Sequence, residues 1–97
     1  MALLNKQGRL TLLRVNALGS GYGPPNDFID VEVVIRLDTN PTEAYGFQLR
    51  NDNEGPARQA MLELLRYAFT VNCLVSLDVY LNAGKKNGIV HRVWVTR

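Results

Sequence analysis

The sequence predicts a mostly β domain in which five strands form a closed barrel and one helix is inserted between the third and fourth strands. Three observations predict it. Apolar and polar residues alternate in five segments, a 3.6-residue apolar period occupies one segment, and Gly, Pro, Asn and Asp cluster between them. The chain has 97 residues, 46% of them hydrophobic, which suits one domain covering residues 1–97 with its own core. The expected element order is β-β-β-α-β-β.

The N-terminal half predicts two strands separated by a long loop. Residues 9–17 form the first expected strand, whose apolar side chains change sides between Leu12 and Leu13. A strand that changes faces contains a bulge or a bend, which lets a small sheet curl. Residues 18–27 carry three glycines and two prolines, which excludes regular structure there. Residues 28–38 alternate most clearly, with one face expected in the core and the other in water.

A third strand and the only helix follow. Residues 45–50 alternate after a turn rich in Asp, Thr, Asn and Pro. Asn53 or Gly55 is the expected N-cap, since Pro56 fits the first turn of a helix. The helical period continues through about Phe69. Its apolar stripe comprises Ala57, Met61, Leu64, Leu65 and Ala68.

Two strands joined by a hairpin complete the expected barrel. Residues 72–82 form the fourth strand. Residues 83–88 form the connection, because the Asn-Gly dipeptide within them readily adopts the positive φ angles of tight turns. Residues 89–97 form the last strand and pair back on the fourth. Alternation in this strand places Val90 and Trp94 on the same face.

The composition excludes several kinds of site. Cys73 is the only cysteine and His91 the only histidine, so neither an internal disulfide nor a zinc site is expected. No sequence signature joins His91 to a nucleophile, so we expect no catalytic residues, no metal and no cofactor. No apolar run approaches the roughly 20 residues that span a bilayer. We therefore expect a cytoplasmic protein without a membrane partner; a mature secreted form that lost its leader has the same appearance.

Two further motifs have simple structural explanations. The glycines of residues 19–23 lack the lysine and Ser/Thr of a phosphate-binding P-loop, and they precede Pro24 and a strand instead of a helix. Asp30, Glu32 and Asp38 occupy alternate positions of one strand. Exposure of one strand face to solvent explains these carboxylates without acid/base catalysis.

The element order, the first strand that bends midway and the long Gly-rich connection between the first two strands resemble the OB fold, a five-stranded barrel. Within that class, the short length and the single helix resemble the pentamer-forming B subunits of bacterial toxins. Those subunits usually carry a signal sequence and often a disulfide, and this chain shows neither. The resemblance covers nearly the whole chain and rests on element order.

This resemblance implies a ligand surface across the second and third strands, flanked by the loops between strands one and two and between strands four and five. The residues that it implies for ligand binding are Tyr22, Arg36, Gln48, Arg50, Lys85 and Lys86. Single-strand binding uses exposed aromatic side chains, and Tyr22 is the only loop aromatic expected to be free for stacking. The net charge of +2 permits nucleic-acid binding without indicating it.

A second surface is predicted from apolar residues that alternation places on the outside of the barrel. These residues are Val34, Tyr80, Val90 and Trp94. Apolar groups on the outside of a small barrel are expected to be covered, either by the chain's own residues 2–4 or by another subunit. We therefore expect a homo-oligomer that uses these four residues at its interface.

Together these observations favour a non-enzymatic binding or assembly module that self-associates, with a saccharide, a protein or a single-stranded nucleic acid as its ligand. The alternative is a nucleic-acid-binding OB domain that uses Lys85, Lys86, Arg36 and Arg50. Salt distinguishes the two, because binding driven by phosphate contacts weakens steeply as the salt concentration rises.

Overall fold

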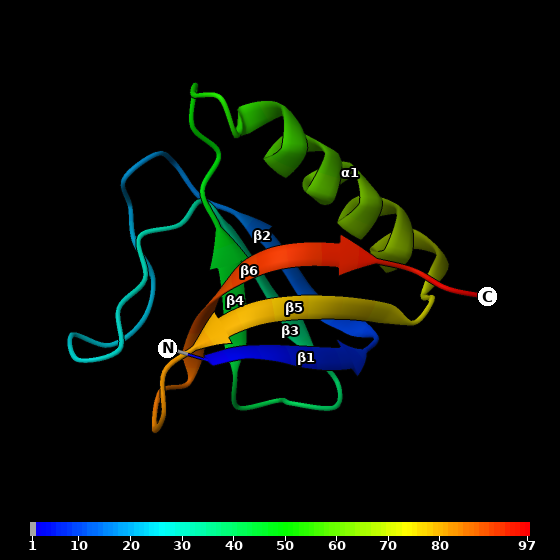
Figure 1. The fold of residues 1–97 in the computed structure, drawn as a ribbon, viewed down its shortest axis with the longest axis horizontal. Coiled ribbons are helices and arrows are strands. Elements are labelled where there is room, and N and C mark those ends of the chain that lie inside the picture. Colours follow the sequence, from blue (N-terminus) through cyan, green and yellow to red (C-terminus); the bar gives the residue numbers. More distant parts are fainter. Residues whose placement is uncertain (1) are drawn as a thin grey trace.

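The computed structural model describes residues 2–97, and this part of the chain contains six strands and one helix (Figure 1). The elements are β1 (Ala2–Gly8), β2 (Leu10–Val15), β3 (Val33–Leu37), β4 (Ala44–Phe47), α1 (Gly55–Val71), β5 (Val75–Leu81) and β6 (Asn87–Trp94). Within residues 2–97, no helix is long and apolar enough to cross a membrane. The prediction of a mostly β fold with one helix is confirmed.

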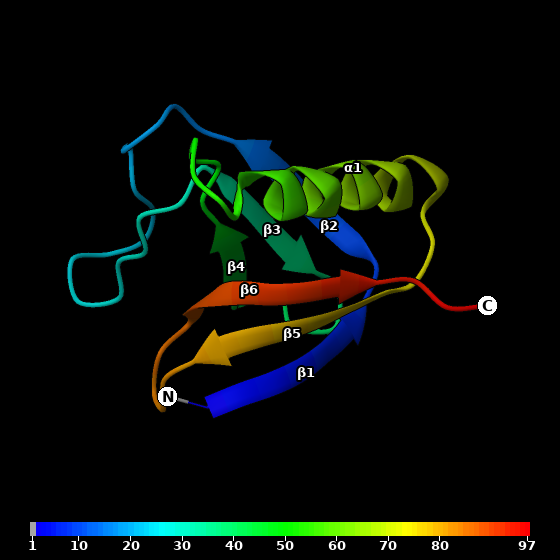
Figure 2. The same cartoon turned by 45° about the horizontal axis from the view of Figure 1, so that its top comes forward.

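The strands form a single sheet in the order β1-β5-β6-β4-β3-β2. All neighbours are antiparallel except β4 and β6, which run parallel. The sheet is strongly curved, so that β1, β5 and β6 cross β2, β3 and β4 at a steep angle (Figures 1 and 2). Helix α1 packs on β2 and β6 and covers one side of this curved sheet.

The predictions of five strands and of a closed barrel are wrong. The sheet has two ends, β1 and β2, which do not pair with each other. Only Arg9 separates these end strands, and its backbone exchanges hydrogen bonds with Asp38: the Arg9 N–H donates to Asp38 Oδ1 and the Asp38 N–H donates to Arg9 O, both at 2.9 Å. A Cβ atom on Gly8 would lie 2.6 Å from Asp38 Oδ1. Glycine therefore allows the chain to turn here from one end of the sheet into the other.

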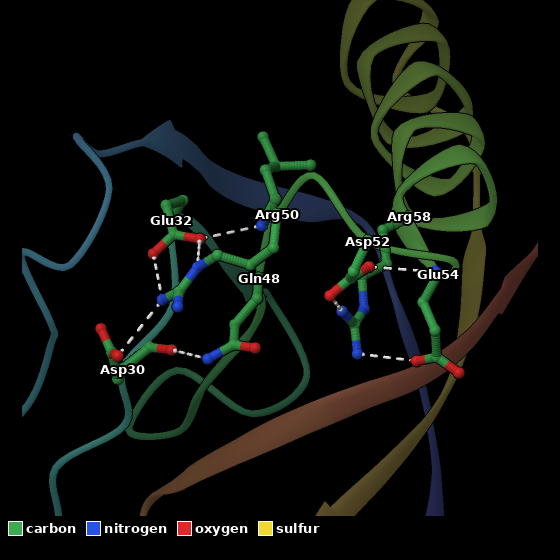
Figure 3. A network of polar contacts seen from close by, with 8 residues as sticks. Asp30, Glu32, Gln48, Arg50, Asp52, Glu54 and Arg58 are labelled. Carbon is green, nitrogen blue, oxygen red and sulfur yellow. Dashed lines mark hydrogen bonds and ion pairs between the residues drawn. The ribbon is translucent and has the colours of Figure 1, made fainter.

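The core lies between the curved sheet and α1. Inward-facing side chains of β3, β4 and β5 fill it, with Leu65 and Ala68 contributed by the helix. Helix α1 begins after Glu54, so the expected N-cap at Asn53 or Gly55 is wrong. Arg58 fixes this helix start through ion pairs with Glu54 (2.8 Å) and Asp52 (3.7 Å), which Figure 3 shows. The apolar stripe of the helix packs against the core through Met61, Leu65 and Ala68, as the 3.6-residue period predicted. Leu62 also packs there, whereas the predicted stripe residue Ala57 is exposed.

A bulge in β6 changes which of its side chains face the core. Asp78 pairs with Arg92 while the next residue, Val79, pairs with Val90, so His91 is an extra residue. The extra residue breaks the alternation, because two successive side chains then point outward. Val90 consequently belongs to the core, and its predicted position on the outer face is wrong.

The remaining residues of the predicted interface have different environments. Val34 does face outward on β3, but it is completely buried under the chain's own loop. Tyr80 and Trp94 are partly exposed. Residues 2–4 were one of the two expected covers, and they form the start of β1, with Leu3 next to Tyr80 in register.

Candidate functional site

The loop between β2 and β3 covers the outer face of the sheet where the OB resemblance implied a ligand. Within the loop, Tyr22 and Ile29 form an isolated antiparallel bridge with two backbone hydrogen bonds of 2.7 and 2.8 Å. Both side chains pack on a second apolar cluster built from Val31, Val34 and Ala44. The face of β3 and β4 is therefore occupied by the chain itself.

Gly46 in β4 permits this close packing. A Cβ atom at this position would lie 2.4 Å from the backbone oxygen of Val33 and 2.5 Å from Cγ2 of Val31. Glycine is required because any larger residue would push the loop and the neighbouring strand away from β4. The loop is thus fitted closely to the sheet at this point.

The base of the loop is fixed by an ion pair between Glu32 and Arg50 (Figure 3). Arg50 Nε donates to Glu32 Oε1 and Arg50 Nη2 donates to Glu32 Oε2, each at 2.9 Å. The carboxylate also accepts backbone N–H groups of Leu49 (2.9 Å) and Gly19 (3.3 Å). The hydrogen bond from Arg50 is the main reason that the pKa of Glu32 falls from 4.5 to about 2. Glu32 is only 2% exposed, so its predicted solvent-facing position is wrong.

Two of the residues implied for ligand binding hold this loop in place. Arg50 also pairs with Asp30 Oδ2 at 3.2 Å. Gln48 Nε2 donates to the backbone oxygen of Asp30 at 3.1 Å. Most of the hydrogen-bonding capacity of the Arg50 guanidinium is therefore satisfied within the chain, since its Nε and Nη2 groups face two carboxylates.

Tyr22 and Arg36, which were implied as ligand residues, contact each other. Arg36 Nη2 donates to the Tyr22 hydroxyl at 2.6 Å, and the Arg14 guanidinium lies 4.7 Å from the centre of the Tyr22 ring. The aromatic residue that the loop exposes is instead Phe28, which is 56% exposed. Its ring lies against Gly21, where a Cβ atom would be only 2.2 Å from Phe28 Cζ. Tyr22 is therefore engaged by Arg36 and Arg14, and Phe28 is the aromatic residue of the loop whose ring is exposed to solvent.

The tip of the loop contacts the connection between β5 and β6. Lys85 Nζ donates to the backbone oxygen of Asn26. The N–H of Lys86 donates to Asp27 Oδ2 at 2.6 Å, and the Asn87 amide donates to the backbone oxygen of Asp27. The two loops that the resemblance implied as flanking a ligand therefore meet here, and Lys85 and Lys86 lie at their junction.

A groove of about 520 Å³, which we call the loop groove, lies beside this junction. Phe28, Tyr80 and Ile89 supply its larger apolar surfaces. Its polar lining consists of Asn26, Asp27, Asp30, Gln48, Asn82, Lys85 and Asn87. Of the six implied ligand residues, Gln48 and Lys85 line this loop groove; Tyr22, Arg36, Arg50 and Lys86 do not.

A second hollow of about 520 Å³ adjoins the loop groove at Tyr80 and Ile89. It lies between the start of α1 and β6, where Met61 and His91 line it. The rings of Tyr80 and His91 meet edge to face, with centroids 5.2 Å apart. Tyr80, which was predicted for a subunit interface, therefore stands between two hollows of the outer surface.

The chemistry of the loop groove suits recognition of an uncharged polar ligand. Its charged lining groups are the carboxylates of Asp27 and Asp30 and the ammonium of Lys85. Carboxylates repel phosphate, while side-chain amides both donate and accept hydrogen bonds. In residues 2–97, no group of three or more His, Cys, Asp or Glu side chains is placed to hold a metal ion.

Sequence reasoning missed Phe28 because alternation assigned it to the second strand. The glycines that precede Phe28 could have indicated a tightly turned loop in this part of the sequence. Gly21 and Gly23 both have positive φ angles, 69° and 110°, and the Phe28 ring packs against Gly21 where a side chain would not fit. Comparisons with family models, with curated proteins and with solved structures find no match to this chain.

Proposed function

We propose that this protein is a non-enzymatic binding module whose ligand lies in the loop groove between Phe28 and Tyr80. The exposure of Phe28 beside an amide-rich groove is the observation that carries the proposal. A large exposed aromatic ring costs solvation free energy unless something covers it, and ligand pockets combine such surfaces with a few placed polar groups.

The ligand that fits this lining is a neutral, hydroxyl-rich molecule, which makes a saccharide the first choice. Aromatic rings pack against the apolar faces of such a ligand. The amides of Gln48 and Asn87 each give one donor to the backbone of the chain, so their remaining N–H groups and their oxygens, together with the Asn82 amide, offer hydrogen bonds to its hydroxyl groups. Asp30 Oδ2 is paired with Arg50, and its other carboxylate oxygen adds an acceptor for a hydroxyl group.

We further propose that the architecture is OB-like, with β1 and β2 as the two halves of one bent strand. Three features support this. The bend at Gly8 lies between strands that pair with β5 and β3 respectively, β4 runs parallel to β6, and α1 joins β4 to β5. In this arrangement the loop groove takes the position between the two loops that flank OB ligands.

The alternative remains a single-stranded nucleic acid, and Phe28 is the observation that favours it, since exposed rings stack on bases. The cations argue against it. Arg50 is paired with two carboxylates, Arg36 donates to the Tyr22 hydroxyl and Lys85 donates to the backbone oxygen of Asn26, so three of the four expected phosphate ligands are engaged within the chain. We accordingly place this function second.

A ligand titration followed by NMR tests both the saccharide and the nucleic-acid proposals. The probes are a panel of neutral oligosaccharides and a single-stranded oligothymidine, each added to the wild type, to Phe28→Ala and to Tyr67→Ala. Tyr67 is the matched control, because it is 58% exposed on α1 and does not line the loop groove. We expect saccharide-induced shifts around Phe28 and Tyr80 that are lost in Phe28→Ala and kept in Tyr67→Ala.

The salt dependence separates the outcomes. Saccharide binding that changes little with salt supports the first proposal, whereas oligothymidine binding that weakens steeply with salt identifies the second. If no probe changes the chemical shifts of the residues that line the loop groove, both the saccharide and the nucleic-acid proposals are contradicted.

Self-association is the second part of the proposed function. Val34 and Val90, two of the four residues predicted for the subunit interface, are buried within the chain. The surface for self-association is therefore a different one.

A further inference from the structure

Strand β1 presents an unpaired edge. It is the first strand in the sheet order, and within residues 2–97 no strand pairs with its outer side (Figure 1). Ala2, Leu3, Leu4 and Asn5 are all exposed. A free edge of this kind is a template for pairing with another strand, because its N–H and C=O groups lack strand partners.

The hydrogen bonds at the end of β1 show which backbone groups face outward. The backbone oxygen of Gln7 accepts the Thr39 hydroxyl, the Arg9 N–H donates to Asp38 Oδ1, and the Arg9 oxygen accepts the Asp38 N–H. Both partners lie on the side away from β5. In an antiparallel ladder alternate residues point their backbone groups to opposite sides. Leu3 and Asn5 therefore direct their N–H and C=O groups to the free edge, while Leu4 and Lys6 bond to β5.

The devices that usually protect an edge are absent from its first four described residues. Residues 2–5 contain no proline and no charged side chain. The nearest charge, Lys6, is turned inward and pairs with Glu43 at 3.2 Å, with both side chains only 18% exposed. Glu43 is held in turn by the Tyr45 hydroxyl. The Lys6 ammonium is therefore held in an ion pair away from the free edge of β1, and residues 2–5 of that edge carry no side-chain charge.

Apolar side chains flank this edge on both faces of the sheet. Leu3 is 48% exposed and lies on the same face as Tyr80, its partner in register. Leu4 is 38% exposed on the opposite face. The other end strand, β2, differs because α1 packs on it and it carries Arg14. The edge of β1 is therefore the better site for pairing.

We infer that β1 pairs antiparallel with β1 of a second copy of this chain, about a two-fold axis that passes beside Leu4. In this register Leu3 faces Asn5 of the second copy, and Asn5 faces its Leu3. Both outward-pointing residues of each strand then form hydrogen-bonded pairs, and the two Leu4 side chains meet across the axis. The register that pairs Asn5 with Asn5 of the second copy places Leu3 opposite Gln7, whose backbone oxygen already accepts the Thr39 hydroxyl.

This inference rests on the self-association part of the proposed function and names its surface. It does not depend on ligand binding, because neither Leu3 nor Asn5 lines the loop groove. One strand pair buries less surface than a standard interface, so the dimer dissociates easily, with a Kd of about 100 μM as the expected order of magnitude.

The test combines sedimentation velocity with NMR amide exchange over a range of protein concentrations, on a chain with no added N-terminal residues. The amides of Leu3 and Asn5 are expected to exchange fast in dilute protein and to become protected, by about tenfold or more, as the concentration passes the Kd. The amides of Leu4 and Lys6 are expected to stay protected throughout, because they bond to β5.

Two variants should abolish the dimer. Asn5→Pro removes an outward N–H and keeps the backbone ladder to β5, since proline is tolerated where the N–H faces away from the sheet. It also removes the bonds that the Asn5 side-chain amide donates to Leu77 O (3.2 Å) and Asp78 Oδ1 (3.3 Å). Leu4→Lys places like charges across the axis and serves if the proline variant is unfolded. Leu18→Lys is the matched control, because Leu18 is an exposed leucine of the β2–β3 loop.

A dimer that persists in both β1 variants, or that Leu18→Lys also abolishes, overturns the inference. A chain that sediments as a monomer of 10.9 kDa up to about 1 mM does so as well, since this is roughly tenfold above the expected Kd. Retained binding of a groove ligand by Asn5→Pro would show that the two parts of the proposed function are independent.

Discussion

Glu32 and Arg50 form a two-pronged ion pair, each nitrogen 2.9 Å from a separate carboxylate oxygen, that joins the end of the β2–β3 loop to the segment after β4. The contact is nearly excluded from water on the glutamate side. It holds the loop on the sheet and so fixes the position of the loop groove. Two predictions about stability depend on this pair.

Replacing Glu32 by Gln should destabilise the fold by about 2–3 kcal/mol, because it removes one charge from a buried pair and leaves hydrogen-bond donors unmatched. Urea unfolding followed by circular dichroism measures this change. Glu63→Gln is the control, since Glu63 is exposed on α1. Equal midpoints for the two variants would show that the Glu32–Arg50 pair contributes nothing.

The pH dependence of stability should carry the signature of the same carboxylate. Its pKa is about 2 in the folded chain and near 4.5 when exposed, so the unfolded state binds the proton more readily. The stabilisation is therefore complete above pH 4.5 and is lost as the pH falls toward 2. The difference in unfolding free energy between wild type and Glu32→Gln should shrink over this range. A difference that stays constant from pH 6 to about pH 2 would contradict the assignment.

Replacing Gly46 by Ala should loosen the loop from the sheet. The added methyl group would meet both the backbone of Val33 and the side chain of Val31 at about 2.5 Å or less, so one of them must move. We expect a loss of about 1–3 kcal/mol. Amide exchange should also be faster at Tyr22 and Ile29, whose side chains pack on the cluster that contains Val31. Unchanged exchange at both amides would mean that the loop is not seated through Gly46.

Much of the fold could be predicted because alternation and the helical period follow directly from burial. The strand that contains Val33 and Ile35 and the helix that buries Leu65 were predicted in this way. Strand β1 was missed for a physical reason. As an edge strand it exposes residues on both faces, so Leu3 and Leu4 follow each other without a polar residue between them. No alternation marks such a segment.

The candidate site could be predicted less well, because it depends on contacts between segments distant in sequence. Alternation predicts that Glu32, which directly precedes β3, is exposed to solvent, but it cannot show that the chain folds over this position. The loop converts an expected solvent-facing carboxylate into a buried one paired with Arg50. In β6, one extra residue at His91 moves Val90 into the core. A single bulge of this kind leaves no reliable mark in the sequence.

The end of α1 offers a final prediction that separates backbone conformation from side-chain contacts. Asn72 follows the helix with φ 56° and ψ 45°, the left-handed conformation that glycine adopts without strain. The N–H of Cys73 donates to Ala68 O at 3.2 Å, and Arg9 Nε donates to Asn72 O at 3.1 Å, so both contacts use backbone oxygens that no substitution at position 72 removes. Asn72→Ala should therefore cost about 1 kcal/mol, whereas Asn72→Gly should leave stability unchanged or raise it by about 0.5 kcal/mol. Urea unfolding of the two variants measures the difference. Equal stability of the alanine and glycine variants would mean that the helix ends in another conformation in solution, since the left-handed geometry alone distinguishes them.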